Sequence, residues 1–114
     1  MPKIIELADL CNEIERSMIK RMIHNAAEYV RAVVIMETAA CNVAGLDAAE
    51  AREAKESTDR ARSLAHDAFI SSVNSVNRIC ERRGVPPIYD GGCERRAYGD
   101  FAIMLIDEIF NKRN

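Results

Sequence analysis

The first part of the chain contains a long stretch that lacks any helix-breaking residue. From Lys3 to Val43 there is neither glycine nor proline. Apolar side chains recur along this stretch at spacings of three and four, which is one face of an amphipathic α-helix. They are Ile4, Leu7, Cys11, Ile14, Met18, Met22, Ala26, Tyr29, Val33, Met36 and Ala40. The pattern predicts a helix over 3–43 and an all-α chain.

The short segment "AGLD" interrupts this periodicity and predicts a turn. Gly45 suits the end of a helix, and Asp47 followed by Glu50 is typical of a capping box at the start of the next one. The three-and-four spacing then resumes, so a second helix is predicted over 47–83.

A third helix is predicted over 94–112. Its start is open between Glu94 and Asp100, because Gly99 is unfavourable inside a helix and Asp100 is a good N-cap.

The lengths of these helices raise a packing problem. A chain of 114 residues is one domain, and the short connections make the first two helices an antiparallel hairpin. Each would be on the order of 50–60 Å long and the third roughly half that, so the third cannot cover the whole apolar stripe. Either the first helix bends near residues 24–29 to give a four-helix bundle, or two chains associate. No breaker residue marks a bend, so we expect a homodimer.

Composition and motifs exclude several classes of protein. The net charge of -2 argues against nucleic-acid binding. The N-terminus is acidic from Glu6 onward and lacks an apolar run, so we expect neither a signal peptide nor a membrane segment. The four cysteines are widely and irregularly spaced, which is typical of reduced thiols in the cytosol rather than of a zinc site. No phosphate-binding loop or nucleophile elbow occurs, and we expect no cofactor.

One stretch, "RRGVPPIYDGGCERRAYGDF" at residues 82–101, does not have the pattern of a continuous helix. Gly84 suits a helix end, Pro86 and Pro87 prevent its continuation, and an ordered loop is predicted over 84–93. Ile88 and Tyr89 are expected to fold back onto the bundle. The segment therefore has an adequate explanation as a connection between helices.

The arginines around this loop favour a second explanation, a small-anion site. Arg95 and Arg96 stand at the start of a predicted helix, where carboxylates are usual, and free N–H groups beside arginines suit an anion. Asn74, Asn77 and Arg78 follow each other at turn spacing on the second helix, where the asparagines would either line a pocket or hydrogen-bond the returning loop. The candidate ligand-binding residues are Asn74, Asn77, Arg78, Tyr89, Arg95 and Arg96.

An alternative function starts from the adjacent pair His66 and Asp67. With His24 before them and Asp100 or Asp107 after them, their order resembles the ligand order of the HD phosphohydrolases, in which a metal activates water. However, His24 shares a polar side of its helix and should point at water. We therefore prefer a non-catalytic interaction or adaptor module, and keep a metal-dependent phosphohydrolase using His66 and Asp67 as the alternative. Redox sensing by Cys93 beside Arg95 and Arg96 is a third hypothesis.

Three segments of the second half resemble a known family. "HDAFISSVNSVNRIC", "GVPPIYDGG" and "RRAYGDFA" are similar to a family of small bacterial all-helical proteins known only as a domain of unknown function. The resemblance covers roughly residues 60–110. It implies a bacterial cytosolic protein with a helical fold, and it implies no reaction, cofactor or catalytic residue.

Overall fold

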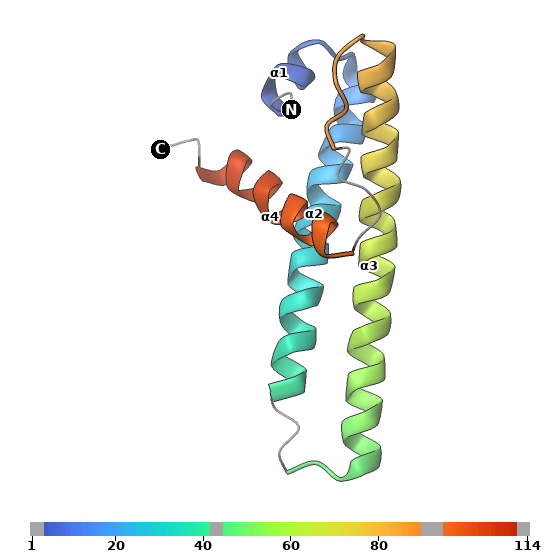
Figure 1. Ribbon diagram of the computed structural model, residues 1–114, viewed down its shortest axis with the longest axis vertical. Coiled ribbons are helices and arrows are strands. Elements are labelled where there is room, and N and C mark those ends of the chain that lie inside the picture. The colour runs from blue at the N-terminus through green and yellow to red at the C-terminus, as the bar shows by residue number, and fades with distance from the viewer. Residues whose placement is uncertain (1–3, 42–44, 90–94, 112–114) are drawn as a thin grey trace.

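The structure is a computed structural model that describes residues 4–41, 45–89 and 95–111, excluding the side chains of 40, 41, 95–97 and 111. Its helices are α1 (Ile4–Asp9), α2 (Glu13–Cys41), α3 (Ala48–Arg82) and α4 (Arg95–Asn111). The long helices α2 and α3 lie side by side as an antiparallel hairpin, and the shorter α4 crosses α2 (Figure 1). The predicted all-α hairpin with a shorter C-terminal helix is confirmed.

The helix expected over 3–43 is divided into α1 and α2 by a break after Asp9. At the break, Asn12 Oδ1 accepts a hydrogen bond from the backbone N–H of Glu15 (2.9 Å), and Glu15 Oε1 accepts one from the N–H of Asn12 (3.0 Å). This reciprocal pair is a capping box, which satisfies N–H groups that a new helix start leaves unpaired. The break lets α1 fold back and bury Ile4 and Leu7. Through residues 24–29 α2 is a continuous helix.

The turn between α2 and α3 ends as its sequence predicts, and residues 42–44, which include the predicted end of the first helix, lie outside the described residues. Gly45 has a φ of +94°, in the left-handed region that favours glycine. Asp47 is the N-cap of α3, and its side chain accepts a hydrogen bond of 2.8 Å from the N–H of Glu50.

The end of α3 is a Schellman motif. Gly84 has a φ of +68°, and its N–H donates to the carbonyl of Glu81 (3.2 Å). The N–H of Val85 donates to the carbonyl of Cys80 (3.0 Å), which completes the motif. The predicted helix end at Gly84 is therefore confirmed.

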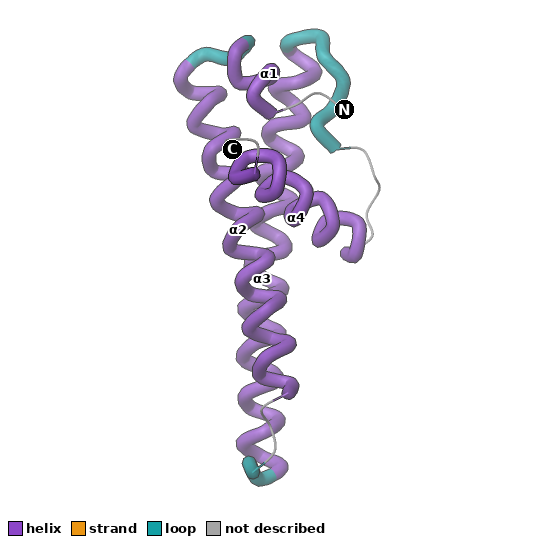
Figure 2. Tube along the Cα trace, turned by 90° about the vertical axis from the view of Figure 1, so that its left-hand side faces the viewer, coloured by secondary structure: helices purple, strands orange, loops and turns teal. Residues whose placement is uncertain are grey.

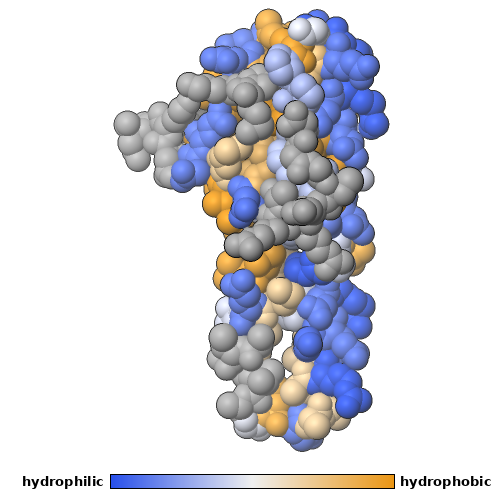
Figure 3. Space-filling view, in the orientation of Figure 1, coloured by the Kyte–Doolittle hydropathy of each residue, from blue (hydrophilic) through white to orange (hydrophobic). Residues whose placement is uncertain are grey.

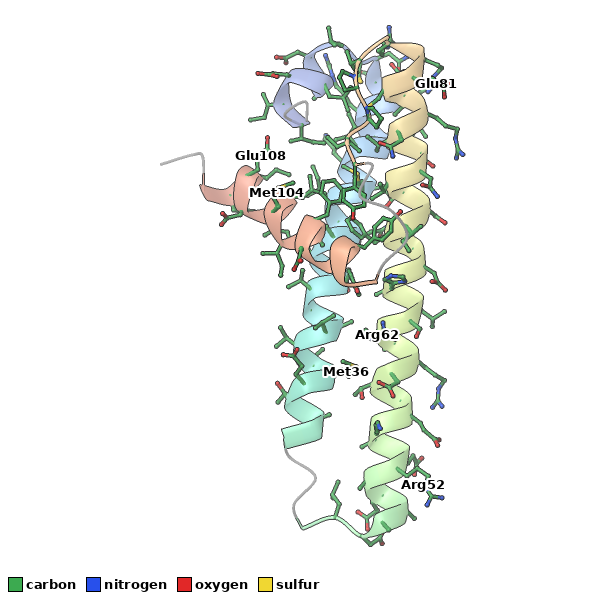
Figure 4. The ribbon with its side chains drawn as sticks, in the orientation of Figure 1. Met36, Arg52, Arg62, Glu81, Met104 and Glu108 are labelled. Atoms are coloured by element: carbon green, nitrogen blue, oxygen red, sulfur yellow. The ribbon has the colours of Figure 1, made fainter. Side chains whose placement is uncertain are left out.

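Helix α4 begins at Arg95, so its start is the earlier of the two alternatives, and Gly99 lies inside it. Glu94 itself is outside the described residues. A Cβ placed on Gly99 would lie 3.8 Å from the hydroxyl oxygen of Tyr29 on α2, so the crossing of the two helices is close at this residue. Farther along α4, Glu108 points toward α1 (Figure 4) and accepts a hydrogen bond from the N–H of Ile4 (3.3 Å).

The core occupies only one half of the hairpin, the half covered by α1, α4 and residues 85–89 (Figure 2). Its largest fully buried side chains are Leu7, Met22, Phe69, Val73, Val76, Ile79, Cys80 and Leu105. Among the described residues, the other half, toward Gly45, consists of the two arms of the hairpin alone. Over the described residues, no helix is long and apolar enough to span a membrane.

Candidate functional site

Asn77 holds the loop that returns from the end of α3. Its Nδ2 donates to the carbonyl of Tyr89 (2.9 Å), and its Oδ1 accepts from the N–H groups of Ile88 (2.8 Å) and Tyr89 (3.4 Å). One amide side chain therefore satisfies three polar groups of the loop backbone. This confirms the interpretation that Asn77 hydrogen-bonds the returning loop.

The loop is also attached by its side chains. Ile88 is buried, and the ring of Tyr89 stacks on Phe101 of α4 with ring centroids 4.5 Å apart and an interplanar angle of 14°. Tyr89 also contacts Tyr98, at a centroid distance of 5.0 Å. These contacts make residues 88 and 89 part of the core, as the sequence predicted for them.

A groove of 390 Å³ lies between this loop and the last turns of α3. It brings together three of the six candidate ligand residues, Asn77, Arg78 and Tyr89. Arg78 is exposed and donates a hydrogen bond to Ser75 Oγ (3.3 Å), whereas Asn74 is exposed outside the groove lining. The side chains of Arg95 and Arg96 lie outside the described residues, so the anion site stays a prediction.

The most buried carboxylate of the described residues was not identified from the sequence. The side chain of Glu15 is 6% exposed and forms ion pairs with Arg83 and, at 3.5 Å, with Arg82. The hydrogen bond from Arg83, supported by the N–H of Asn12, holds the pKa of Glu15 below its ordinary value, and the same carboxylate raises the pKa of Arg83. The Asn-x-x-Glu spacing of Asn12 and Glu15 is a sequence signal for the capping box, whereas the pairing with Arg83 has no such signal.

Among the described residues, no third ligand-type side chain joins His66 and Asp67. His66 is only 7% exposed and makes edge contacts with the rings of Tyr29 and Tyr98. Its Nδ1 lies 3.4 Å from Asp67 Oδ1, and its buried Nε2 has no hydrogen-bond partner. His24 is exposed on α2, as its position on the polar side of the helix predicted. Across the described part of the chain, no group of three or more His, Cys, Asp or Glu side chains could hold a metal ion.

Two of the four cysteines are described, and both are buried free thiols. Burial raises the pKa of Cys11 and of Cys80, which keeps them protonated and unreactive. Cys93, the residue of the redox hypothesis, lies outside the described residues, as does the side chain of Cys41.

Apolar surface is exposed below α4, on the side from which α4 crosses the hairpin (Figure 3). Val34 of α2 is 54% exposed, and Ile103 and Phe110 of α4 are 57% and 62% exposed. Ile103 and Phe110 are seven residues apart and so lie on the same face of their helix. Burial of such side chains is favourable, and a face of this kind is typical of an interaction surface.

Comparison with known proteins finds one family. A family model described as "Protein of unknown function (DUF3232)" matches residues 3–114. The match includes the N-terminal helices, so the extent expected from the sequence, residues 60–110, was too short. No curated protein and no solved structure matches the chain.

Proposed function

The chain belongs to the DUF3232 family, a family of unknown function, and we propose that it is a non-catalytic helical interaction module that works as a homodimer. The polar residues that the fold brings together support this reading because they have structural tasks. Asn77 holds the loop, and Glu15 joins the start of α2 to the residues at the end of α3.

The observation that carries the proposal is the surface area of the single chain. It exposes 7610 Å², whereas a folded monomer of 12.8 kDa is expected to expose roughly 6,300 Å². The excess of about 1,300 Å² exceeds the roughly 800 Å² that each partner buries in a standard interface. The radius of gyration of 16.6 Å likewise exceeds the value of about 13 Å expected for a compact chain of this length.

Exposed apolar side chains lie on the parts of the surface that a second chain would cover. On the arms and tip of the hairpin they are Val34, Ile35, Leu46 and Leu64, and on α4 they are Ile103, Met104 and Phe110. None of these side chains belongs to the core, which lies in the half of the hairpin where α4 crosses α2. A second copy of the chain would cover them and complete the bundle.

Sedimentation equilibrium of the purified protein tests the homodimer. We expect a mass of twice 12.8 kDa at micromolar concentration and a reversible decrease in mass on dilution. A mass of one chain at every accessible concentration would overturn the proposal.

The small-anion site at the loop is a narrower proposal. Its support is the exposed guanidinium of Arg78 at the edge of the 390 Å³ groove. Glu81 lines the same groove, and its carboxylate opposes the binding of an anion. The geometry therefore favours a structural role for the loop, as a segment that packs against the helices. A thermal-shift measurement with inorganic phosphate, on wild type and on Arg78→Ala, tests whether the groove binds an anion.

A further inference from the structure

A second groove lies in the half of the hairpin that the core does not fill. Its volume is 570 Å³, and Met36, Ala39, Ala51 and Thr58 line its apolar part. Met36 extends from α2 toward α3 in this half (Figure 4). Figure 3 shows the hollow between the two arms below α4, on the side from which α4 crosses α2. The groove therefore lies between the same two helices as the core, in the half that α4 does not cover.

The α3 wall of this groove supplies positive charge. Arg52 and Lys55 line it, together with Asp59 of α3 and Glu37 of α2. A groove with an apolar floor and charged walls of both signs suits an amphipathic helix better than a small ion, because a helix can present apolar and charged side chains on one face.

Helix α4 carries a face of the complementary kind. The apolar pair Ile103 and Phe110 is exposed, and the exposed Asp100 precedes Ile103 by three residues, on the neighbouring part of the same face. Asp107, seven residues after Asp100 and so on the same face, is exposed as well. The outward face of α4 is thus apolar and acidic.

We propose that the groove receives the outward face of α4 from a second copy of the chain. In a twofold dimer each surface is used twice, because a contact from one protomer to its partner is repeated in reverse. Two hairpins would then lie antiparallel and face to face, with both α4 helices between them. Lys55 of one protomer would lie near Asp100 of the other. This inference rests on the proposed homodimer and adds the surfaces that form it.

A charge exchange on the full chain tests the contact. Lys55→Glu and Asp100→Lys should each weaken the dimer by roughly two- to fivefold, since each replaces an attraction with a repulsion. The double variant should recover most of the wild-type affinity, because the exchanged charges again attract. Lys20→Glu, the same change at an exposed position of α2 outside the groove, should leave the affinity unchanged. The dissociation constants come from sedimentation equilibrium at low salt, where charge contributes most.

An apolar pair of variants tests the floor of the groove. Ala51→Glu and Ile103→Glu should each raise the dissociation constant by about tenfold or more, because each places a charge in the contact. Ala61→Glu, at an exposed position of α3 outside the groove, is the matched control. Circular dichroism and thermal melts establish that every variant is folded.

The outcomes separate the two proposals. If the wild type dimerises but the Lys55, Ala51 and Ile103 variants dimerise equally well, the groove is not the interface and this inference fails, while the homodimer stands. If the wild type is monomeric, both fail.

Discussion

Glu15, three residues after the N-cap of α2, accepts a hydrogen bond from Arg83, the residue that ends α3. The contact spans 68 positions of the chain and closes the end of the hairpin that contains the core. Glu15 also completes the capping box with Asn12, so one carboxylate both starts a helix and joins it to its neighbour.

The pH dependence of stability should show this contact. The folded state lowers the pKa of Glu15 from an ordinary value of 4.5, so the carboxylate stabilises the fold fully above that pH and progressively less as the pH falls through the lowered pKa. The difference in melting temperature between wild type and Glu15→Gln should therefore be constant between about pH 7 and pH 5 and shrink below it. Glu13→Gln, an exposed change two residues earlier, should show no such difference. A difference that grows on acidification would contradict the assignment.

Removal of the Asn77 side chain, which hydrogen-bonds the backbone of residues 88 and 89, should destabilise the protein. Asn77→Ala leaves the N–H groups of Ile88 and Tyr89 and a carbonyl without their partner, which should cost about 1–3 kcal/mol of unfolding free energy. Urea denaturation measures it. The matched change Asn74→Ala, at an exposed position of the same helix, should stay within about 0.5 kcal/mol of wild type. Equal losses of stability in the two variants would contradict the assignment of Asn77 as the residue that holds the loop.

Two glycines should respond to alanine with opposite signs. Gly99→Ala should stabilise the protein by about 0.5–1 kcal/mol, because alanine is the better helix former, and its Cβ would meet Tyr29 at an ordinary distance of 3.8 Å. Gly84→Ala should destabilise it by about 1–2 kcal/mol, because the φ of +68° is strained for any residue with a Cβ. Thermal or urea unfolding of both variants gives the sign of each change in unfolding free energy. A loss of stability in Gly99→Ala would contradict the conclusion that the crossing of α2 and α4 leaves room for a methyl group at this position.

Replacement of His66 by phenylalanine should not destabilise the protein. His66→Phe removes the buried Nε2 that has no hydrogen-bond partner and keeps the edge contacts with Tyr29 and Tyr98. It loses only the long contact of Nδ1 with the exposed Asp67 (3.4 Å). We expect a gain of about 1 kcal/mol in unfolding free energy, and no change in the response of the melting temperature to zinc, manganese or a chelator. A metal-dependent stabilisation of wild type that the variant loses would restore the phosphohydrolase hypothesis.

The local signals in the sequence predicted the helices and most of their ends. Asp47 and Gly84 determine helix boundaries through capping and backbone conformation, which depend on near neighbours alone. The break before α2 has an equally local signal, Asn12 and Glu15, but the apolar spacing continues across it and predicted one helix. The candidate site was predicted in part, because Asn77 was expected either to line a pocket or to hydrogen-bond the returning loop, and it does both.

By itself, the sequence determined the all-α class, the hairpin and the turn that joins its arms, because helical periodicity and capping are properties of adjacent residues. Only the tertiary structure decided that α4 crosses α2 rather than extending along the arms, that His66 is buried, and that Arg83 pairs with Glu15. The reason is physical: burial and ion pairing depend on which other element covers a residue, and contacts across 68 positions leave no periodic pattern in either segment.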